Sequence, residues 1–438
     1  MTTRLADVEE IPGVHAVPLA AGPRARLLFY AGVPILFINF AAPYNGLLGL
    51  PITFFLKNRL HLSAHDSATF VIIVSIPLFV GFLFGLARDR WSPGGAGDRG
   101  HLVLFGLLSA VIFTALAFIA PTYAVLAVGV LLINVTLQFA AGAAAGLASA
   151  VGRHHAMAGQ MSTVINAAIL TPQFLAMLAG GVLSQALEGA QAAAAARALF
   201  LVGAALTIGM TAYGAFGPKQ LFDDAKAGAE AEAAAAPAKT SLGADVVRLL
   251  STWAIWPVVI IQLLWQFAPG AGLALQYHLA NEMHATDSQV GAFFAIFYAG
   301  FVPVFGLYSW LARRLKLGTL LWIGGVLAVP QMVSLLFIKS AGGALWAAVP
   351  MGLLGGIGQA AFTDLAIRSC PKGLEGTMMM LFLALFFIAQ KFGDLWGADL
   401  YQSHGGYNMT LYATIAIYAA ILPVILLVPK AIKAGKDA

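Results

Sequence analysis

Charged residues are scarce in this chain. Only 10% of its 438 residues are Asp, Glu, Lys or Arg, whereas 60% are apolar. Soluble domains carry about 25% charged and about 45–50% apolar residues. So few charges could not cover the surface of a soluble protein of this length. The composition therefore excludes a soluble enzyme, a secreted disulfide scaffold and a disordered protein, and it indicates that lipid is the main solvent.

Cysteine is also nearly absent, because Cys370 is the single one. This count excludes an internal disulfide and a multi-cysteine metal or cluster site. The sequence has no Walker phosphate loop and no apolar run with clustered histidines and acids, so we expect no cofactor, no bound metal and no enzymatic activity. The net charge of +5 fits basic cytoplasmic loops of a membrane protein better than nucleic-acid binding.

In contrast to charged residues and cysteine, long apolar runs are abundant in the chain. A helix that spans a bilayer needs about 20 mostly apolar residues, and the sequence contains twelve such runs. They are 27–56, 67–87, 101–120, 122–148, 158–186, 193–216, 253–280, 287–313, 317–338, 343–367, 373–402 and 407–430. The division between the third and fourth runs, near Pro121, is the hardest to place. We therefore predict an all-α membrane protein with twelve transmembrane helices.

A polar, low-complexity stretch divides these runs into two sets of six. Residues 217–250 contain the run AGAEAEAAAAPAKTS, and we interpret them as a cytoplasmic linker that is partly helical at its alanines. This stretch predicts a six-helix bundle over 27–216 and a second over 251–430. The flanking segments, 1–26 and 431–438, are predicted to be cytoplasmic tails.

The basic residues predict the orientation of the helices. If both ends of the chain are cytoplasmic, 19 of the 24 Lys and Arg residues lie on the cytoplasmic side and four on the opposite side, with Lys391 inside a span. Such an asymmetry is the positive-inside pattern of membrane proteins. We therefore expect a multi-pass protein of the cell inner (plasma) membrane.

The two halves also resemble each other at an offset of about 225 residues. The matching segments are NFAAPYNGL (39–47) with QFAPGAGL (266–273), SAHD (63–66) with TDSQ (286–289), and GLARDR (85–90) with WLARRL (310–315). An even number of spans separates the copies, so the repeat is parallel, as in the major facilitator transporters. The matched Pro43 and Pro269 are expected to interrupt their helices near a binding site.

Two segments extend this similarity to known families. The run IPLFVGFLFGLARDRW (76–91) resembles the major facilitator signature between the second and third helices, in which Gly85, Asp89 and Arg90 match the residues that lock the cytoplasmic side. The usual basic run after the turn is replaced by a glycine-rich stretch with only Arg99. The resemblance implies two parallel six-helix repeats in the major facilitator fold.

The second segment, RSCPKGLEGTMMMLF (368–382), resembles the opening of helix 11 in folate–biopterin transporters, and LPITFFLKNRLHLS (50–63) supports the same family. The matching positions are Cys370, Pro371, Gly373, Glu375 and Thr377. The resemblance implies a secondary transporter for an organic, often anionic solute, such as a pterin or folate. Related permeases carry muropeptides and siderophores, so the substrate stays open.

Two charged residues lie inside a predicted span, where charge is costly. Lys391 and Asp394 are three residues apart and therefore neighbours on one helical face. One interpretation is that Lys391 attracts an anionic group of the substrate and Asp394 takes a proton during transport. The alternatives are a structural ion pair, or a position of Asp394 near the outer interface close to Asp399.

Polar and aromatic residues in apolar runs are the candidates for binding a polar solute. In the major facilitator fold, helices 1, 4, 7 and 10 line the central cavity. The candidates are Asn39, Asn45, Asn134, Gln138, Gln262, Trp265, Gln266 and Tyr298, with Lys391, and two further amides are Asn166 and Gln173. The alternative for the amides is bonding between helices, worth about 0.6 kcal/mol on average.

A third group of charges lies at predicted cytoplasmic helix ends and could form a gate. Its members are Asp89, Arg90, Arg153, Asp364, Arg368 and Glu375. As a gate, these residues would form ion pairs that break when the cytoplasmic side opens. The alternative is ordinary charge pairing at solvated helix ends.

Two functions remain open from the sequence. The first is a monomeric secondary transporter that moves a small organic solute by alternating access, coupled to protons. The second is a non-transporting protein of the same fold, such as an assembly factor or a lipid or pigment chaperone, which would lack a closed central cavity lined by the amides.

Overall fold

The structure is a computed structural model. Among the residues that it describes, all regular secondary structure is helical. The described residues are 19–43, 48–49, 52, 55–56, 60–62, 64–188, 192–234, 247, 249–371, 373–403 and 405–437. The candidate binding residue Asn45 and the predicted helix start at Ser63 lie outside these ranges.

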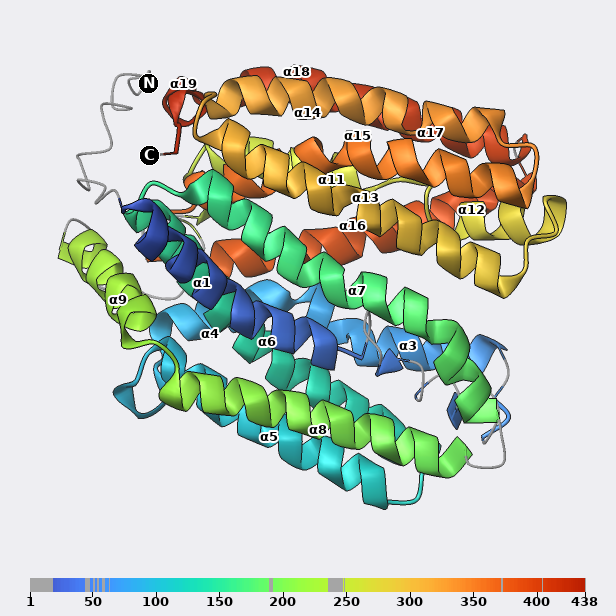
Figure 1. Cartoon of the computed structure of the whole chain (residues 1–438), viewed down its shortest axis with the longest axis horizontal. Coiled ribbons are helices and arrows are strands. Elements are labelled where there is room, and N and C mark those ends of the chain that lie inside the picture. The colour runs from blue at the N-terminus through green and yellow to red at the C-terminus, as the bar shows by residue number, and fades with distance from the viewer. Residues whose placement is uncertain are drawn as a thin grey trace.

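The first half of the chain forms one bundle (Figure 1). Its helices are α1 (Ala21–Ala41), α3 (Ala64–Phe79), α4 (Gly81–Arg90), α5 (Asp98–Phe118), α6 (Tyr123–His154), α7 (Ala158–Glu188) and α8 (Ala192–Phe216). α3 and α4 together make the second predicted span. Part of the expected linker is helical, as α9 (Lys219–Ala234), and it packs against the end of α6.

The second half forms the other bundle (Figure 1). Its elements are α11 (Ile255–Gln266), α12 (Leu273–Tyr277), a π-helical turn (His278–Glu282), α13 (Asp287–Ala312), α14 (Leu317–Gln331), a 3₁₀ turn (Val333–Phe337), α15 (Ala341–Arg368), α16 (Glu375–Ser403), α17 (Gly406–Ala419), α18 (Ile421–Leu427) and α19 (Lys430–Ala434). The protein therefore has the two helical bundles that the hydropathy pattern predicts.

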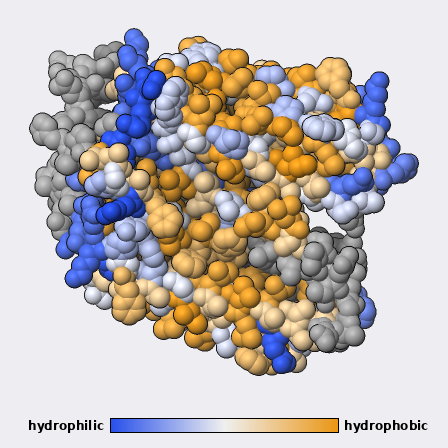
Figure 2. Space-filling model, viewed as in Figure 1, coloured by the Kyte–Doolittle hydropathy of each residue, from blue (hydrophilic) through white to orange (hydrophobic). Residues whose placement is uncertain are grey.

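Eleven helical segments in the described ranges are long and apolar enough to cross a membrane. Figure 2 shows hydrophobic residues over the middle of one face and hydrophilic residues gathered at the end where α9 and α19 lie. This distribution is that of a multi-pass membrane protein, because apolar surface is stable in the lipid interior and charged residues are stable in water.

The seventh predicted span, 253–280, needs correction, because it is not one helix. α11 ends at Gln266, and helical geometry resumes only at Leu273. Pro269 lies in this break and has no N–H to continue a helix. The backbone groups of Gly270, which make no helical hydrogen bond in the break, bond to side chains of α17. The Gly270 N–H donates to Thr414 Oγ1 at 2.8 Å, and the Gly270 carbonyl oxygen accepts from the Tyr407 hydroxyl at 3.0 Å. In the first half, α1 likewise ends at Ala41, before Pro43.

Helix caps confirm two of the predicted boundaries. Thr286 and Gln289 form a capping box at the start of α13, each side chain bonding the other's backbone N–H. Thr122 caps α6, whereas α5 ends at Phe118. The apolar stretch around Pro121 is therefore divided into two helices, as predicted.

The two bundles meet along two helix pairs, α4 with α16 and α7 with α13. At one end of the molecule, α4, α6 and α15 end while α7 and α16 begin; we call it the clasped end. There α4 and α16 approach so closely that a Cβ on Gly85 would lie 2.3 Å from the Gly376 carbonyl oxygen. Only glycine fits at this position.

Replacing Gly85 tests whether this approach matters for stability. Gly85→Leu should force α4 and α16 apart and lower the free energy of unfolding by about 1–3 kcal/mol, the usual cost of overpacking. The melting temperature of the purified protein measures the change. Gly306→Leu is the matched control, because a Cβ on Gly306 in α13 meets no atom within 4 Å. Equal melting temperatures for the two variants would contradict the tight packing.

Candidate substrate cavity and gate

A cavity of about 490 Å³ lies between the two bundles. α1, α6 and α7 line it from the first half, and α11, α12, α13, α15 and α16, with the ends of α14 and α17, line it from the second. Its polar lining residues are Asn39, Asn166, Gln173, Gln262, Gln266, Gln276, Gln331, Gln359, Thr363, Gln390, Lys391 and Asp394. Most of these are carboxamides, which both donate and accept hydrogen bonds, so the wall suits an uncharged or weakly charged polar solute.

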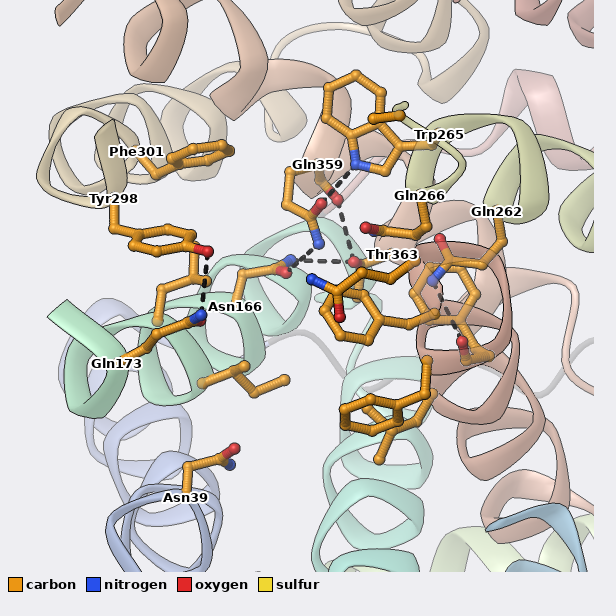
Figure 3. Close-up of a pocket in the computed structure, with 18 of the residues that line it drawn as sticks. Asn39, Asn166, Gln173, Gln262, Trp265, Gln266, Tyr298, Phe301, Gln359 and Thr363 are labelled. Atoms are coloured by element: carbon orange, nitrogen blue, oxygen red, sulfur yellow. Dashed lines mark hydrogen bonds between the residues drawn. The ribbon is translucent and has the colours of Figure 1, made fainter. Parts of the chain in front are cut away.

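Hydrogen bonds in the cavity wall connect the two bundles (Figure 3). Gln359 on α15 donates to the side-chain oxygen Oδ1 of Asn166 on α7 at 2.9 Å, and it accepts from the Trp265 indole N–H at 2.6 Å. Asn166 also donates to Thr363 Oγ1, at 3.0 Å. We call these four residues the crossing network. It fixes the amides and the indole in defined orientations.

Aromatic rings complete the wall. Trp265 stacks on Tyr418 with ring centroids 5.0 Å apart and meets Phe362 edge-on at 5.4 Å. Across the cavity, the Gln173 amide donates to the Tyr298 hydroxyl at 3.0 Å, which joins α7 to α13 (Figure 3). These contacts hold the rings in place, so they form a rigid apolar surface among the amides.

The structure places six of the residues predicted to bind substrate on the cavity wall, and Asp394 lies beside them. The six are Asn39, Gln262, Trp265, Gln266, Tyr298 and Lys391. Asn39 and Gln262 each donate to a backbone carbonyl, that of Ile35 at 2.8 Å and that of Phe382 at 3.1 Å. Their side-chain oxygens are not used in these bonds.

The placement of Asn134 and Gln138 on the cavity wall needs correction. Both are buried in α6 on the face toward α3 and α4, away from the cavity. Asn134 donates to the Val74 carbonyl oxygen at 2.6 Å, so it bonds two helices of one bundle. A Cβ on Gly81 would lie 3.6 Å from Gln138 Oε1, which places this amide against α4. We leave both residues out of the proposed binding set.

Several lining residues were missed by the sequence analysis. They are Gln276, Gln331, Gln359, Thr363 and Gln390. A signal for two of them existed, because Gln359 and Thr363 are four residues apart in an apolar run and therefore share one face of the helix.

Lys391 and Asp394 both line the cavity, but the ion pair considered above does not form. Within the described ranges, no contact of 4.0 Å or less joins the Lys391 ammonium to a carboxylate. Asp394 instead accepts from the Leu273 N–H at 3.1 Å, at the start of α12. A Cβ on Gly272 would lie 2.0 Å from Asp394 Oδ1, so glycine is required beside this bond. Asp394 thus holds the helix that resumes after the break.

At the clasped end, Asp89 bonds across the two bundles. Its carboxylate accepts from the backbone N–H groups of Gly376 at 3.0 Å and Thr377 at 2.8 Å, and from the Thr377 hydroxyl at 2.6 Å. These N–H groups belong to the first turn of α16, where no intrahelical acceptor exists. The negative charge also lies at the positive end of the helix dipole.

The basic partner of Asp89 is Arg88 and not the predicted Arg90. Arg88 donates to Asp89 at 2.8 Å and donates two hydrogen bonds of 2.6 Å to the Asp98 carboxylate. Arg90 is exposed at the end of α4. Each residue along a helix rotates the side chain by about 100°. Arg88 and Arg90 are two residues apart and therefore point about 200° apart, so only one of them can face α16.

The other predicted gate residues form two clusters at the same end. Arg153 on α6 pairs with Glu375 on α16 and donates to the Cys370 carbonyl oxygen at 2.6 Å, again across the bundles. Asp364 and Arg368 pair at 2.7 Å within α15. Asp364 is 0% exposed, which does not fit the alternative of solvated helix ends.

Comparisons with known proteins bear on the fold. No protein-family model matches the chain, and no curated protein sequence matches it. A solved structure does match: that of a proton:xylose symporter of the major facilitator superfamily, bound to 6-bromo-6-deoxy-D-glucose. The TM-score is 0.69 at 13% identity, over 94% of this chain and 96% of the symporter. The predicted major facilitator fold is confirmed, whereas the folate–biopterin relationship is not.

Replacing Gln359 tests the crossing network. Gln359→Leu leaves the Trp265 indole N–H and the Asn166 side-chain oxygen without their partner. Leaving buried polar groups unpaired lowers the free energy of unfolding by about 1–3 kcal/mol. We expect a lower melting temperature of the purified protein. Gln390→Leu is the matched control, since Gln390 lines the same cavity with no hydrogen bond to another described residue. If both variants melt alike, the network does not stabilise this state.

Proposed function

We propose that the protein is a secondary active transporter that moves a small polar organic solute across the inner membrane by alternating access, with protons as the coupling ion. The observation that carries this proposal is the carboxamide- and aromatic-lined cavity between two bundles that are clasped together at one end. A cavity at the interface of two repeats is where transporters of this architecture bind their substrates.

The cavity suits a metabolite-sized solute. Its volume of about 490 Å³ lies within the range of about 300–1,000 Å³ for small-molecule sites. Trp265 and Tyr298 offer flat apolar surfaces, and the amides offer donors and acceptors in fixed positions. Lys391, which lines the same cavity, would attract an anionic group such as a carboxylate. A pterin, folate or siderophore with such a group fits this chemistry, as does a neutral sugar.

The distribution of basic residues supports a cytoplasmic location for the clasped end, since Arg88, Arg153 and Arg368 lie there. Both ends of the chain would then be cytoplasmic. In this orientation the structure corresponds to a state that is closed on the cytoplasmic side, with Lys391 and Asp394 in the outer half of the cavity.

Asp394 is the candidate for proton coupling. As a carboxylate it accepts the Leu273 N–H at 3.1 Å. Protonation would remove its charge and weaken this bond, which frees α12 and the broken part of the span to move. Proton binding would thus be linked to the mobility of one wall of the cavity. The symporter with the same fold is itself a proton:xylose symporter, which supports this mode of coupling.

The alternative of a non-transporting assembly factor or lipid chaperone predicts no closed cavity lined by amides between the bundles. The cavity described above therefore favours transport, and its location within one chain supports a transporter that works as a monomer.

The solute can be found by thermal shift, because a ligand that binds the folded state raises its melting temperature. Pterins, folates, siderophores, peptides and sugars form the screen. A solute that raises the melting temperature is then tested for uptake into proteoliposomes with and without a pH gradient. Uptake that depends on the protein but never on the gradient would overturn proton coupling; absence of uptake for every binding solute would overturn transport.

Replacing Asp394 separates coupling from movement of the solute. One coupled proton and one pH unit across the membrane support about tenfold accumulation, since each pH unit is 1.36 kcal/mol. Asp394→Asn should lose this accumulation and keep solute exchange across the membrane. Asp399→Asn, at an exposed carboxylate further along α16, is the matched control and should accumulate normally. Normal accumulation by Asp394→Asn would remove this residue from the mechanism.

A further inference from the structure

The segment after α19 carries a carboxylate that is buried at the clasped end. The Asp437 side chain is 0% exposed. One of its oxygens, Oδ1, pairs with Arg368 at 2.5 Å and accepts from the Gly159 N–H at 3.1 Å. The other, Oδ2, accepts from the Gln160 N–H at 2.8 Å and from its side-chain amide at 3.3 Å. All the described hydrogen-bond partners of this carboxylate are therefore donors, and they come from both bundles.

These bonds have the same form as those of Asp89 on α16. Gly159 and Gln160 are the second and third residues of α7, and Gly376 and Thr377 are the second and third residues of α16. Both carboxylates thus cap the first turn of a helix at the same register. An arginine accompanies each of them, Arg368 beside Asp437 and Arg88 beside Asp89.

The sequences around the two capped turns also match. The start of α7 reads Ala-Gly-Gln-Met (158–161) and the start of α16 reads Glu-Gly-Thr-Met (375–378). In both places the glycine allows a close approach: a Cβ on Gly159 would lie 2.5 Å from the Ala312 Cβ, and one on Gly376 would lie 2.8 Å from Asp89 Oδ1. The two turns are therefore equivalent positions of the internal repeat.

The acid that should cap α7 is missing from its place in the repeat. Asp89 belongs to GLARDR (85–90), and the corresponding segment of the second half is WLARRL (310–315), which puts Arg314 where Asp89 stands. Arg314 points elsewhere, with its guanidinium 4.0 Å from the centre of the Trp310 ring. The segment 310–315 thus offers no carboxylate at this turn. Asp364 of α15 lies nearby, with its Oδ2 2.9 Å from a Cβ built on Gly159, but its described bonds are to Arg368 and the Tyr308 hydroxyl.

The chain beyond α19 lies against that same turn. The Asp437 N–H donates to the Ala312 carbonyl oxygen at 3.0 Å, and the Leu317 N–H donates to the Gly435 carbonyl oxygen at 2.8 Å. These two bonds hold residues 435–437 between α13 and α14 on one side and the start of α7 on the other. The backbone contacts explain how Asp437 reaches a site that the repeat assigns to residue 314.

We propose that Asp437 holds the two bundles together at the cytoplasmic side, as Asp89 does, by binding the first turn of α7. It takes the place of the acid that is absent at position 314. The start of α7 then stays bound to the second bundle only while residues 435–437 are docked. Opening of the cytoplasmic side requires these residues to leave the α7 amides and Arg368. This last step rests on the proposed alternating access; the docking itself does not.

The single cysteine provides a reporter for the test. Cys370 is buried at the clasped end, 6% exposed, between α15 and α16. Its rate of alkylation by N-ethylmaleimide in the full-length protein in lipid nanodiscs measures how often this end opens. This measurement needs no transported solute. The alkylation rate tests whether Asp437 keeps this end closed, and solute uptake tests transport, so either proposal can fail without the other.

Asp437→Asn and deletion of residues 435–438 should each raise the alkylation rate of Cys370 by about tenfold, because both remove charge-assisted bonds to buried donors. Asp437→Glu should be intermediate. Asp223→Asn, at an exposed acid on α9, is the matched control and should react like the unchanged protein. Gel filtration and the melting temperature check that each variant is folded.

An unchanged alkylation rate in both Asp437→Asn and the deletion variant would overturn the proposed role of Asp437. An equal increase in Asp223→Asn would overturn it as well, because the effect would then follow from charge alone. A further variant tests whether position 314 is equivalent to Asp89. Adding Arg314→Asp to the deletion variant should lower the alkylation rate of Cys370 most of the way to that of the unchanged protein. A rate that stays as high as in the deletion variant would overturn the equivalence.

Discussion

The arrangement of the two bundles depends on a carboxylate held by the first turn of a helix from the opposite bundle. Asp89 satisfies two backbone N–H groups of α16 that have no partner within the helix. This bond requires α4 and α16 to touch, and Gly85 and Gly376 make the contact possible. The bundles are joined in this way at the clasped end, and the cavity lies between them.

Besides the packing of α4 on α16 and of α7 on α13, hydrogen bonds and ion pairs join the bundles, which suits a protein with two states. A hydrogen bond contributes only about 0.5–1.5 kcal/mol net, because water replaces the lost partner on opening. The bonds of Asp89, the Arg153–Glu375 pair and the crossing network can therefore be exchanged for water at modest cost. Each bundle has its own apolar core, and a few residues at the interface, Ile367 and Met379 with the first core and Leu86 with the second, pack across it.

Much of the fold follows from local properties of the sequence. Hydropathy predicts the spans, and Pro269 predicts the break after α11, because each depends on a short run of residues. The cavity wall is harder to predict, since the helical face that looks inward depends on packing: Gln262 faces the cavity, whereas Asn134 faces α3. The choice of Arg88 over Arg90 depends on which side of α4 packs against α16, since the two arginines are two residues apart and point about 200° apart. The role of Asp437 depends on a contact 278 residues away along the chain, with Gly159, for which no local pattern exists.

The bonds of Asp89 to the first turn of α16 set the separation of the bundles at the clasped end. Spin labels at the exposed positions Arg90 and Arg313, in a Cys370→Ala background, report this separation by pulsed electron resonance. We expect one short distance to dominate in the otherwise unchanged protein, and a second, longer distance to grow when Asp89→Asn is added. An identical distance distribution with and without Asp89→Asn, in protein that remains folded, would show that Asp89 does not set the separation.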